Sequence, residues 1–314
     1  MSKAYRNDPQ RARSSQSRYT FYEFDQDFPG DAACMEWLVG FLYPDGIYCP
    51  KCERVTKHHR VRNRTCYECQ YCGHQEYPLV GTIFENSSTS LRLWFHAIFL
   101  MSQTRCGISA KQLERELGVT YKTAWRMANK IRSLLQEDDD EPLSGTVEAD
   151  ETYYGGRRRD TPRGRPSEDS HKTPVFGMAQ RKGEKGKGRV VATTVRNTKR
   201  ATVMPHIKKK VLPESMVYTD EYKIYDTLNR EGYQHDRVNH AEEIYVAGDV
   251  HTNMIDGFWS LFKRGIGGVY HSVSAKHLQG YLDEYSFRYN HRDEPGGMFN
   301  AFLARVEKAP SPDG

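Results

Sequence analysis

The sequence has no long hydrophobic segment. Its longest apolar stretch, from Trp94 to Met101, is interrupted by His96, and no run approaches the roughly 18 residues of a membrane-spanning helix. The first residues are polar and charged, and they lack the apolar core of a secretory signal. We therefore expect a soluble, intracellular protein that has no membrane partner.

Cysteine is scarce outside one short region of the chain. Only seven of the 314 residues are cysteines, and six of these lie between residues 31 and 82. In a reducing compartment, such clustering favours a metal site over disulfide bonds. Cys34 and Cys106 stand alone, and we expect them to pack as small hydrophobic residues.

The clustered cysteines form two CxxC pairs, Cys49-Pro-Lys-Cys52 and Cys69-Gln-Tyr-Cys72, with 16 residues between them. Each pair presents two thiolates from one tight turn, and two pairs complete a tetrahedron of sulfur around Zn²⁺. Four protein ligands leave no open position for water, so the zinc is predicted to be structural. Cys66 and Cys69 also form a CxxC pair and remain an alternative. Gly73 favours Cys69 with Cys72, because it permits the turn after Cys72.

The net charge excludes little, because 46 Lys and Arg against 41 Asp and Glu leave only +5. The distribution of charge is more informative. Residues 181–200 hold eight Lys or Arg and one Glu, and the first eighteen residues are also basic. Basic side chains neutralise phosphates and release counterions, so several such blocks favour a polyanionic partner.

Composition divides the chain into five segments. Twenty Tyr and 13 Phe residues argue against general disorder. We predict a flexible basic arm over 1–30, a zinc ribbon over 31–82, a helix-turn-helix DNA-binding domain over 88–136, an acidic linker over 137–145 and a domain of strands and helices over 146–308. The predicted fold class is therefore multi-domain α+β.

Residues 88–136 show the apolar spacing of helices. A first helix is predicted from Ser90, and Ser109 can cap a second one. Gly118 supplies a turn and Thr120 caps a longer helix, so the last two helices form a helix-turn-helix pattern. The outer face of the last helix can reach phosphates and base edges of DNA. To this face we assign Tyr121, Lys122, Thr123, Arg126, Lys130 and Arg132.

Three acidic residues lie in predicted elements of the last domain. Asp150 lies in a strand-like segment that ends on a glycine pair, and Asp220 ends a second short strand. Asp256 begins the polar face of a predicted helix. Carboxylates that converge from different elements hold Mg²⁺, and two such cations can clamp the attacking and leaving oxygens of a phosphoryl transfer.

Several motifs together resemble those of bacterial insertion-sequence transposases of the Merlin superfamily, which carry an ISXO-like transposase domain. The resemblance covers roughly residues 30–305. Its carriers are Cys49-Pro-Lys-Cys52, Gly81-Thr82-Ile83-Phe84, Val147 to Gly156, Val217-Tyr-Thr-Asp220, His251-Thr-Asn253-Met-Ile-Asp256-Gly-Phe-Trp259-Ser-Leu-Phe-Lys263-Arg264 and Phe287-Arg-Tyr-Asn290-His-Arg292. Members of this superfamily join a zinc ribbon to an RNase-H-like DDE domain.

The resemblance implies that Asp150, Asp220 and Asp256 hold two catalytic Mg²⁺ or Mn²⁺ ions. Between Asp220 and Asp256 lie 35 residues, a gap common before the third acid of such enzymes. Asp256 stands where Glu is usual, and some relatives use Asn as the third ligand, so Asn253 is an alternative. Lys263 stands where such families often place a basic residue on the transposon end, and Arg264 follows it.

An RNase-H-like domain carries specific expectations for the sheet, a mixed one flanked by helices. The strand with Asp150 should lie at its centre, with Val175–Gln180 and Arg189–Val195 as neighbouring antiparallel strands. Asp220 should end a fourth strand, and the helix with Asp256 should pack across the sheet.

Three other polar side chains lie close to the acids in the sequence. We expect strand alternation to point Glu148 and Glu151 away from the Asp150 face, which leaves them without a role in the site. His251 is predicted to cap the following helix or pack against it, and contact with a phosphate is the alternative.

The function implied by the resemblance is that of a transposase. Such an enzyme binds the terminal inverted repeats of an insertion sequence and catalyses metal-dependent cleavage and strand transfer. Its partners are double-stranded transposon ends and target DNA, in the bacterial cytoplasm at the nucleoid. Two ends must be joined, so a homodimer or larger assembly is expected. The alternative is a transposase-derived DNA-binding protein or regulator that has lost catalysis.

Overall fold

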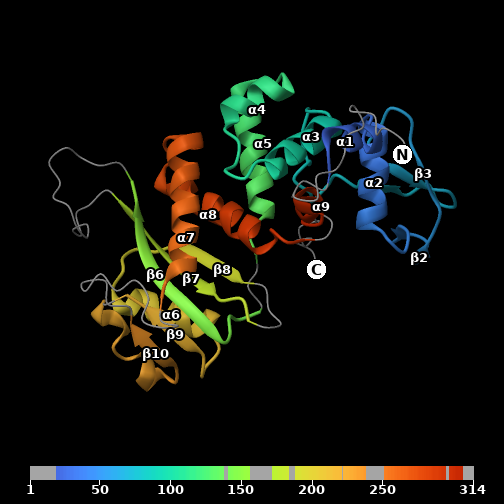
Figure 1. Ribbon diagram of the computed structural model, residues 1–314. Helices are drawn as coiled ribbons and strands as arrows, with labels where there is room; N and C mark the ends of the chain where they lie inside the picture. The colour runs from blue at the N-terminus through green and yellow to red at the C-terminus, as the bar shows by residue number, and fades with distance from the viewer. Residues whose placement is uncertain are drawn as a thin grey trace, which may run out of the picture. The chain divides into compact units, whose positions relative to one another are not determined.

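A computed structural model describes residues 19–137, 141–155, 172–183, 188–220, 222–237, 251–294 and 297–306. The chain divides into two compact units, one of Met1–Gln103 with Asp293–Gly314 and one of Thr104–Arg292 (Figure 1). Most of the predicted basic arm and the middle of the acidic linker lie outside the described residues. Within the described ranges, no helix is long and apolar enough to cross a membrane.

The first unit combines helices with five short strands. Its elements are α1 (Phe21–Asp27), α2 (Asp31–Leu42), β1 (Tyr48–Cys49), β2 (Arg54–Val55), β3 (His58–Arg60), β4 (Tyr67–Cys69), β5 (Gln75–Glu76), α3 (Leu91–Gln103) and α9 (Gly297–Leu303). The strands form two antiparallel sheets, β1-β2 and β3-β4-β5. Such short strands bury little apolar surface, so we expect this region to depend on another source of stability.

Aromatic side chains form the core between the helices of the first unit. The rings of Phe28 and Phe95 lie 4.9 Å apart, and those of Phe24 and Phe99 lie 5.1 Å apart. Phe299 of α9 lies 5.7 Å from Phe99. The apolar face that predicts a helix from Ser90 onward is therefore the face that α3 buries.

The second unit begins with α4 (Ala110–Leu117) and α5 (Tyr121–Leu134). The predicted caps are confirmed, because the hydroxyls of Ser109 and Thr120 accept hydrogen bonds from the backbone N–H groups of Gln112 and Thr123. Gly118 ends α4 with a φ of 63°, a left-handed conformation that glycine adopts without strain. The two helices and the turn between them are those that the sequence predicts.

The prediction that Arg132 lies on the outer face of α5 is wrong. Its side chain is 3% exposed, and its Nε donates to Glu284 at 2.7 Å. The guanidinium also lies 4.0 Å from the ring centre of Tyr281. Arg132 therefore joins α5 to the helix that carries Glu284 and Tyr281, and it is not available to DNA.

A five-stranded mixed sheet forms the centre of the second unit. Its strands are β6 (Thr146–Tyr154), β7 (Thr173–Gln180), β8 (Arg189–Thr194), β9 (Met216–Thr219) and β10 (Gln234–Arg237), in the order β10-β9-β6-β7-β8. β7 is antiparallel to β6 and to β8, and β9 is parallel to β6 and to β10. The Asp150 strand lies at the centre, and β7 and β8 form as predicted, but β8 pairs with β7 and the second neighbour of β6 is β9; β10 is an addition.

Helices cover both faces of this sheet (Figure 1). The remaining elements are α6 (Arg200–Lys210), the short 3₁₀ helices η1 (Lys223–Tyr225) and η2 (Leu228–Glu231), α7 (Asn253–Gly265), the π-helical η4 (Ile266–Tyr270) and α8 (Ala275–Asn290). Val147 and Phe176 pack toward α6, whereas Val175 and Ala179 pack toward α7 and α8. Apolar side chains of the strands therefore pack against helices on each face of the sheet. Helix α7 lies across β6 and β7 as predicted.

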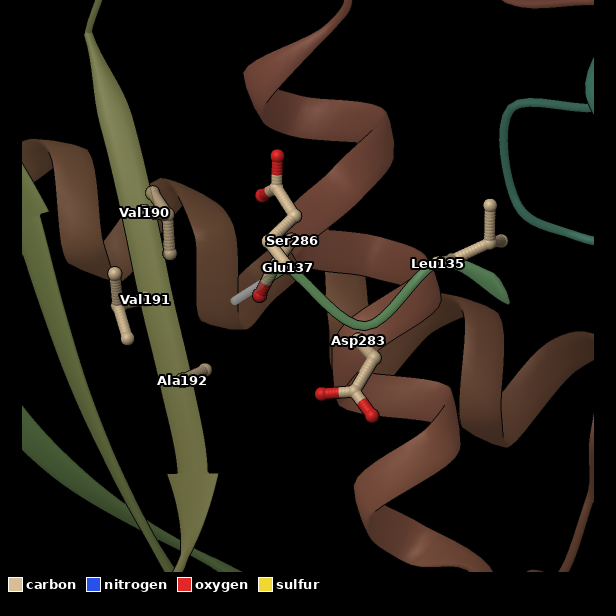
Figure 2. A pocket seen from close by; sticks show the side chains of 7 residues that line it. All are labelled: Leu135, Glu137, Val190, Val191, Ala192, Asp283 and Ser286. Atoms are coloured by element: carbon tan, nitrogen blue, oxygen red, sulfur yellow. The ribbon is translucent and has the colours of Figure 1, made fainter. Parts of the chain in front are cut away.

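A small recess lies between β8, α8 and the segment after α5 (Figure 2). Its lining is Leu135, Glu137, Val190, Val191, Ala192, Asp283 and Ser286. None of these residues is among the acids or basic side chains that the sequence predicts to be functional. We therefore do not take this recess as the candidate functional site.

Candidate active site and metal centre

The parallel pairing of β6 and β9 brings Asp150 and Asp220 together. Ala149 pairs with Thr219, so the two aspartates come next on neighbouring strands that run in the same direction. Carboxylate oxygens of Asp150, Asp220 and Glu151 all lie within 4.8 Å of one another. Oxygen-only donor sets of this kind suit Mg²⁺ or Mn²⁺.

Asp150 is the most confined of these acids. The indole N–H of Trp259 donates to its Oδ2 at 2.9 Å. Burial raises the pKa of Asp150 to about 7, and the charges of Glu151, Asp220 and Asp256 act in the same direction. Negative charge is therefore crowded at this end of the sheet, and a divalent cation among the carboxylates would relieve the repulsion.

Asp256 lies in the first turn of α7, exposed to solvent. The hydroxyl of Thr252 donates to its Oδ2 at 3.0 Å. Asp256 is not in the group of three oxygens within 4.8 Å, but it is close enough to Asp150 for its charge to raise the pKa of that residue. Asn253 is the first residue of the same helix, one turn earlier, and is also exposed. Lys263 and Arg264 lie exposed in its last turn.

The expectation that Glu148 points away from the Asp150 face is wrong. Residues 148 and 150 are two apart in β6, so their side chains lie on the same face of the sheet. Glu148 is fully buried there and contacts α7. Glu151 follows Asp150 in the same strand. Its carboxylate accepts a hydrogen bond from Tyr225 and also lies within 4.8 Å of carboxylate oxygens of Asp150 and Asp220.

His251 lies beside Glu148, just before α7. Its Nδ1 is 2.8 Å from the guanidinium of Arg181 and 3.3 Å from a carboxylate oxygen of Glu148. The His251 side chain therefore packs beside Arg181 and Glu148. Arg181 also donates to the His251 carbonyl at 2.6 Å.

A second candidate metal centre lies in the first unit. The sulfur atoms of Cys49, Cys52, Cys69 and Cys72 all lie within 4.8 Å of one another. The Sγ atoms of Cys49 and Cys72 are 3.4 Å apart, and those of Cys52 and Cys69 are 3.9 Å apart. Zn–S bonds of about 2.3 Å in a tetrahedron place sulfurs about 3.8 Å apart, so the donor set fits zinc. Cys66 is buried outside this group of four sulfurs.

The predicted DNA-contacting residues occupy the surface of α5. Tyr121 is 46% exposed, and Lys122 and Arg126 are also exposed, whereas Lys130 is half-buried. Trp125, which the sequence analysis does not single out, is exposed between them, and its ring lies 5.3 Å from that of His277 on α8.

Comparison with known proteins places these features in a family. An ISXO2-like transposase domain matches residues 142–290, and a transposase zinc-ribbon domain matches residues 29–75. An uncharacterized protein in the transposable element ISH50 of Halobacterium salinarum is 31% identical over 286 residues, which span 86% of this chain and 94% of the relative. The chain belongs to the ISXO2-like transposase family. An uncharacterized transposase-like protein of Haemophilus influenzae is 33% identical over 107 residues, or 34% of this chain and 85% of that protein.

Solved structures with some likeness to this chain are more distant. A pre-cleavage Mos1 transpososome is 12% identical, with 68% of this chain and 76% of that chain covered and a TM-score of 0.24. A Mos1 transposase paired-end complex with the left transposon end is 10% identical, with 65% and 78% covered and a TM-score of 0.23. Likenesses this weak carry no conclusion about the fold or function of this chain.

The sequence assigns no role in the acidic site to two residues that lie there. Trp259 is named only within the motif that carries the family resemblance, yet its N–H reaches Asp150. Gly177 pairs with Asp150 across β6 and β7, and a Cβ there would lie 2.5 Å from the indole. A glycine in the interior of a strand often marks the close approach of another element, and that signal could have indicated this position.

Proposed function

We propose that this transposase binds double-stranded DNA at the terminal inverted repeats of its element, cuts the ends and joins them to target DNA. The support for catalysis is the parallel register that sets Asp150 beside Asp220, with the Asp256 helix across the same sheet face. We also propose that the sheet and helices of the second unit are an RNase-H-like domain, and that α4 and α5 are a helix-turn-helix.

Asp150, Asp220 and Asp256 are the proposed ligands of two Mg²⁺ or Mn²⁺ ions, and Asn253 is the alternative third ligand. When bound, such a pair polarises the attacking and leaving oxygens of an in-line phosphoryl transfer. Trp259 occupies one oxygen of Asp150 and so restricts the rotation of that carboxylate. Because bound metal ions would activate the nucleophile, the site would need no side chain as a general base.

The chain's basic side chains have a different role in this proposal. Lys263 and Arg264 lie on the same helix as Asp256 and offer positive charge to phosphates at the transposon end. The proposed contacts to the inverted repeat lie on α5 and are Tyr121, Lys122, Arg126 and Lys130.

Zinc held by Cys49, Cys52, Cys69 and Cys72 stabilises the first unit. Two ends must be paired, so we propose a homodimer or larger assembly on DNA.

Catalysis is tested by cleavage of a duplex that carries the element end. The wild-type chain should cut only when Mg²⁺ or Mn²⁺ is present. Asp150→Ala and Asp220→Ala should abolish cutting while end binding, measured by gel shift, stays within about threefold of wild type. A wild-type chain that binds the end and never cuts it would instead support the DNA-binding regulator.

DNA recognition by α5 is tested separately. Arg126→Ala or Lys130→Ala should weaken end binding by about 1–3 kcal/mol if the side chain reads a base edge, with a steep dependence on salt. Arg115→Ala, on α4, is the matched control, and it should affect specific and non-specific duplexes equally. Unchanged affinity in both α5 variants would move recognition to another part of the chain.

A further inference from the structure

The first turn of α7 lacks the side-chain cap that a helix usually takes from its own N-cap residue. Thr252 occupies that position but makes no capping hydrogen bond. Its hydroxyl donates to the Oδ2 of Asp256 instead, at 3.0 Å. The N–H groups of the first turn have no partner within the helix, so they require an acceptor from elsewhere.

Glu148 of β6 supplies that acceptor. Its Oε2 accepts from the N–H groups of Met254 at 2.8 Å and Ile255 at 3.0 Å, across 106 and 107 residues of sequence. A carboxylate at this place also interacts favourably with the positive end of the helix dipole. The position of α7 is therefore tied directly to a strand residue.

Glu148 is itself held in a fixed orientation. Its side chain is fully buried, and its Oε1 accepts from the Nε of Arg181 at 2.7 Å. Arg181 also donates to the His251 carbonyl at 2.6 Å and lies 4.7 Å from the ring centre of Tyr218. Both carboxylate oxygens of Glu148 are therefore engaged, one by the arginine and one by the helix.

The same helix is attached to β6 a second time. Glu148 stands two residues before Asp150, and the two N–H groups it binds belong to the residues just before Asp256. One turn after Asp256, the indole of Trp259 donates to Asp150. The attachments therefore lie on either side of Asp256, and they connect the helix of that acid with the strand of Asp150.

We propose that Glu148 is a positioning residue, which sets α7 on β6 so that Asp256 stands at the correct place beside Asp150 and Asp220. The proposal rests on the proposed function, because Asp256 matters only if these acids hold the catalytic metals. Changing a residue that orients a metal ligand typically lowers metal affinity or activity about 10–100-fold.

Three substitutions in the full-length chain separate position from charge. Glu148→Asp keeps the charge opposite Arg181 but is one methylene shorter, so it cannot reach the helix without a shift. Glu148→Gln keeps the length and one acceptor oxygen but loses the charge. Glu148→Ala loses both. Glu284→Gln is the matched control, because Glu284 of α8 is equally buried and pairs with two arginines but does not contact α7 through its carboxylate.

Two measurements are needed besides cleavage. Mn²⁺ binding, followed by titration calorimetry, should weaken about 10–100-fold in Glu148→Asp and Glu148→Ala, and less in Glu148→Gln. Amide hydrogen exchange of Met254 and Ile255 should accelerate in the same order. The Glu284→Gln control should bind Mn²⁺ as the wild-type chain does. Cleavage by Glu148→Asp should need correspondingly higher Mg²⁺, while end binding is retained.

The outcomes distinguish this inference from the proposed function. If Glu148→Asp and Glu148→Gln both bind Mn²⁺ and cut as the wild type does, Glu148 is not a positioning residue. If Glu148→Ala does not fold, the other two variants decide the matter. If the wild-type chain neither binds Mn²⁺ at the acids nor cuts DNA, the proposed function fails. In that case faster exchange of the two amides in Glu148→Asp would still show that Glu148 holds α7.

Discussion

Gly177 on β7 gives the indole of Trp259 room to lie against the sheet. A Cβ at this position would stand 2.5 Å from Trp259 and 2.9 Å from Ile255, distances at which side chains must move. Trp259 is the donor to Asp150, so a displacement here reaches the candidate active site through one hydrogen bond. At the scale of single residues, packing and the orientation of a proposed metal ligand are therefore linked.

Gly177→Ala should destabilise the second unit by about 1–3 kcal/mol, because the added methyl group overpacks a filled core. It should also reduce cleavage, since the indole can no longer reach Asp150. Denaturant unfolding and the cleavage assay measure the two effects. Gly280→Ala on α8 is the control, with its Cβ at an ordinary 3.9 Å from Arg132. Normal stability and cutting in Gly177→Ala would show that the indole does not need this space.

The identity of the third ligand is also decided by single residues. Asp256→Ala should abolish Mg²⁺-dependent cleavage, because its carboxylate lies near Asp150 and is oriented by Thr252. Asp256→Glu should retain part of the activity, since the backbone is adapted to the shorter side chain. Asn253→Ala, assayed in parallel, should cut at a near-normal rate. A dead Asn253→Ala with an active Asp256→Ala would make Asn253 the ligand.

At the scale of elements, a buried ionic network joins α5 to α8. Glu284 is fully buried and accepts from Arg132 at 2.7 Å and from Arg288 at 2.6 Å. Arg288 also donates to the carbonyl of Thr104 at 2.9 Å. The helix proposed to read DNA is thus attached to a helix that packs on the five-stranded sheet, and both belong to one compact unit.

Glu284→Gln should cost about 3–5 kcal/mol of the free energy of unfolding at neutral pH, because it leaves the buried arginines without a balancing charge. Burial opposes ionisation, but Arg288 and Arg132 outweigh it and hold the pKa of Glu284 below its ordinary value. A lowered pKa stabilises the folded state above the unfolded pKa, and the gain is lost as the pH falls through the folded one. The difference in the free energy of unfolding between wild type and Glu284→Gln should therefore be constant above about pH 5 and shrink below it.

Chemical denaturation from pH 7 to pH 3.5 measures this dependence. Glu116→Gln, an exposed change on α4, is the control and should leave stability nearly unchanged. A difference between wild type and Glu284→Gln that does not vary with pH would contradict the account of the network.

At the scale of the whole molecule, the chain divides into two compact units. The first unit has five short strands around the four clustered cysteines, and such strands bury too little apolar surface to be stable alone. The second unit has a five-stranded sheet with apolar cores on both faces. We therefore expect metal removal to affect the two units differently.

Cys69→Ser in the full-length chain should lower zinc content below one ion per chain and accelerate amide exchange in the strands of the first unit. The sheet of the second unit should exchange as in wild type. Cys66→Ser is the matched control, because Cys66 is buried outside the group of four sulfurs, and it should keep its zinc. Retention of zinc by Cys69→Ser and its loss from Cys66→Ser would reverse the assignment of the second CxxC pair.

Local patterns in the sequence were sufficient for several parts of this protein. The two CxxC pairs, the caps Ser109 and Thr120, and the turn at Gly118 depend on residues a few positions apart, so short spacing predicts them. The central place of the Asp150 strand and the existence of the other strands that became β7, β8 and β9 were also predicted, with the help of the family resemblance, but the place of β9 beside β6 was not. Asp150 and Asp220 lie together as expected, because β6 and β9 are parallel and Ala149 pairs with Thr219, so the next residue of each strand is the aspartate.

Tertiary structure alone decided the roles of Arg132 and Glu148. Arg132 has the spacing of a surface residue, but it is buried because Glu284, 152 residues later, provides a matching carboxylate. Glu148 is an ordinary strand acid in the sequence, yet it holds the first turn of α7 from 106 residues away. A charge can be buried only where a partner offsets the loss of hydration. When that partner lies more than a hundred residues away, no local pattern identifies it, and only the folded chain brings the two together.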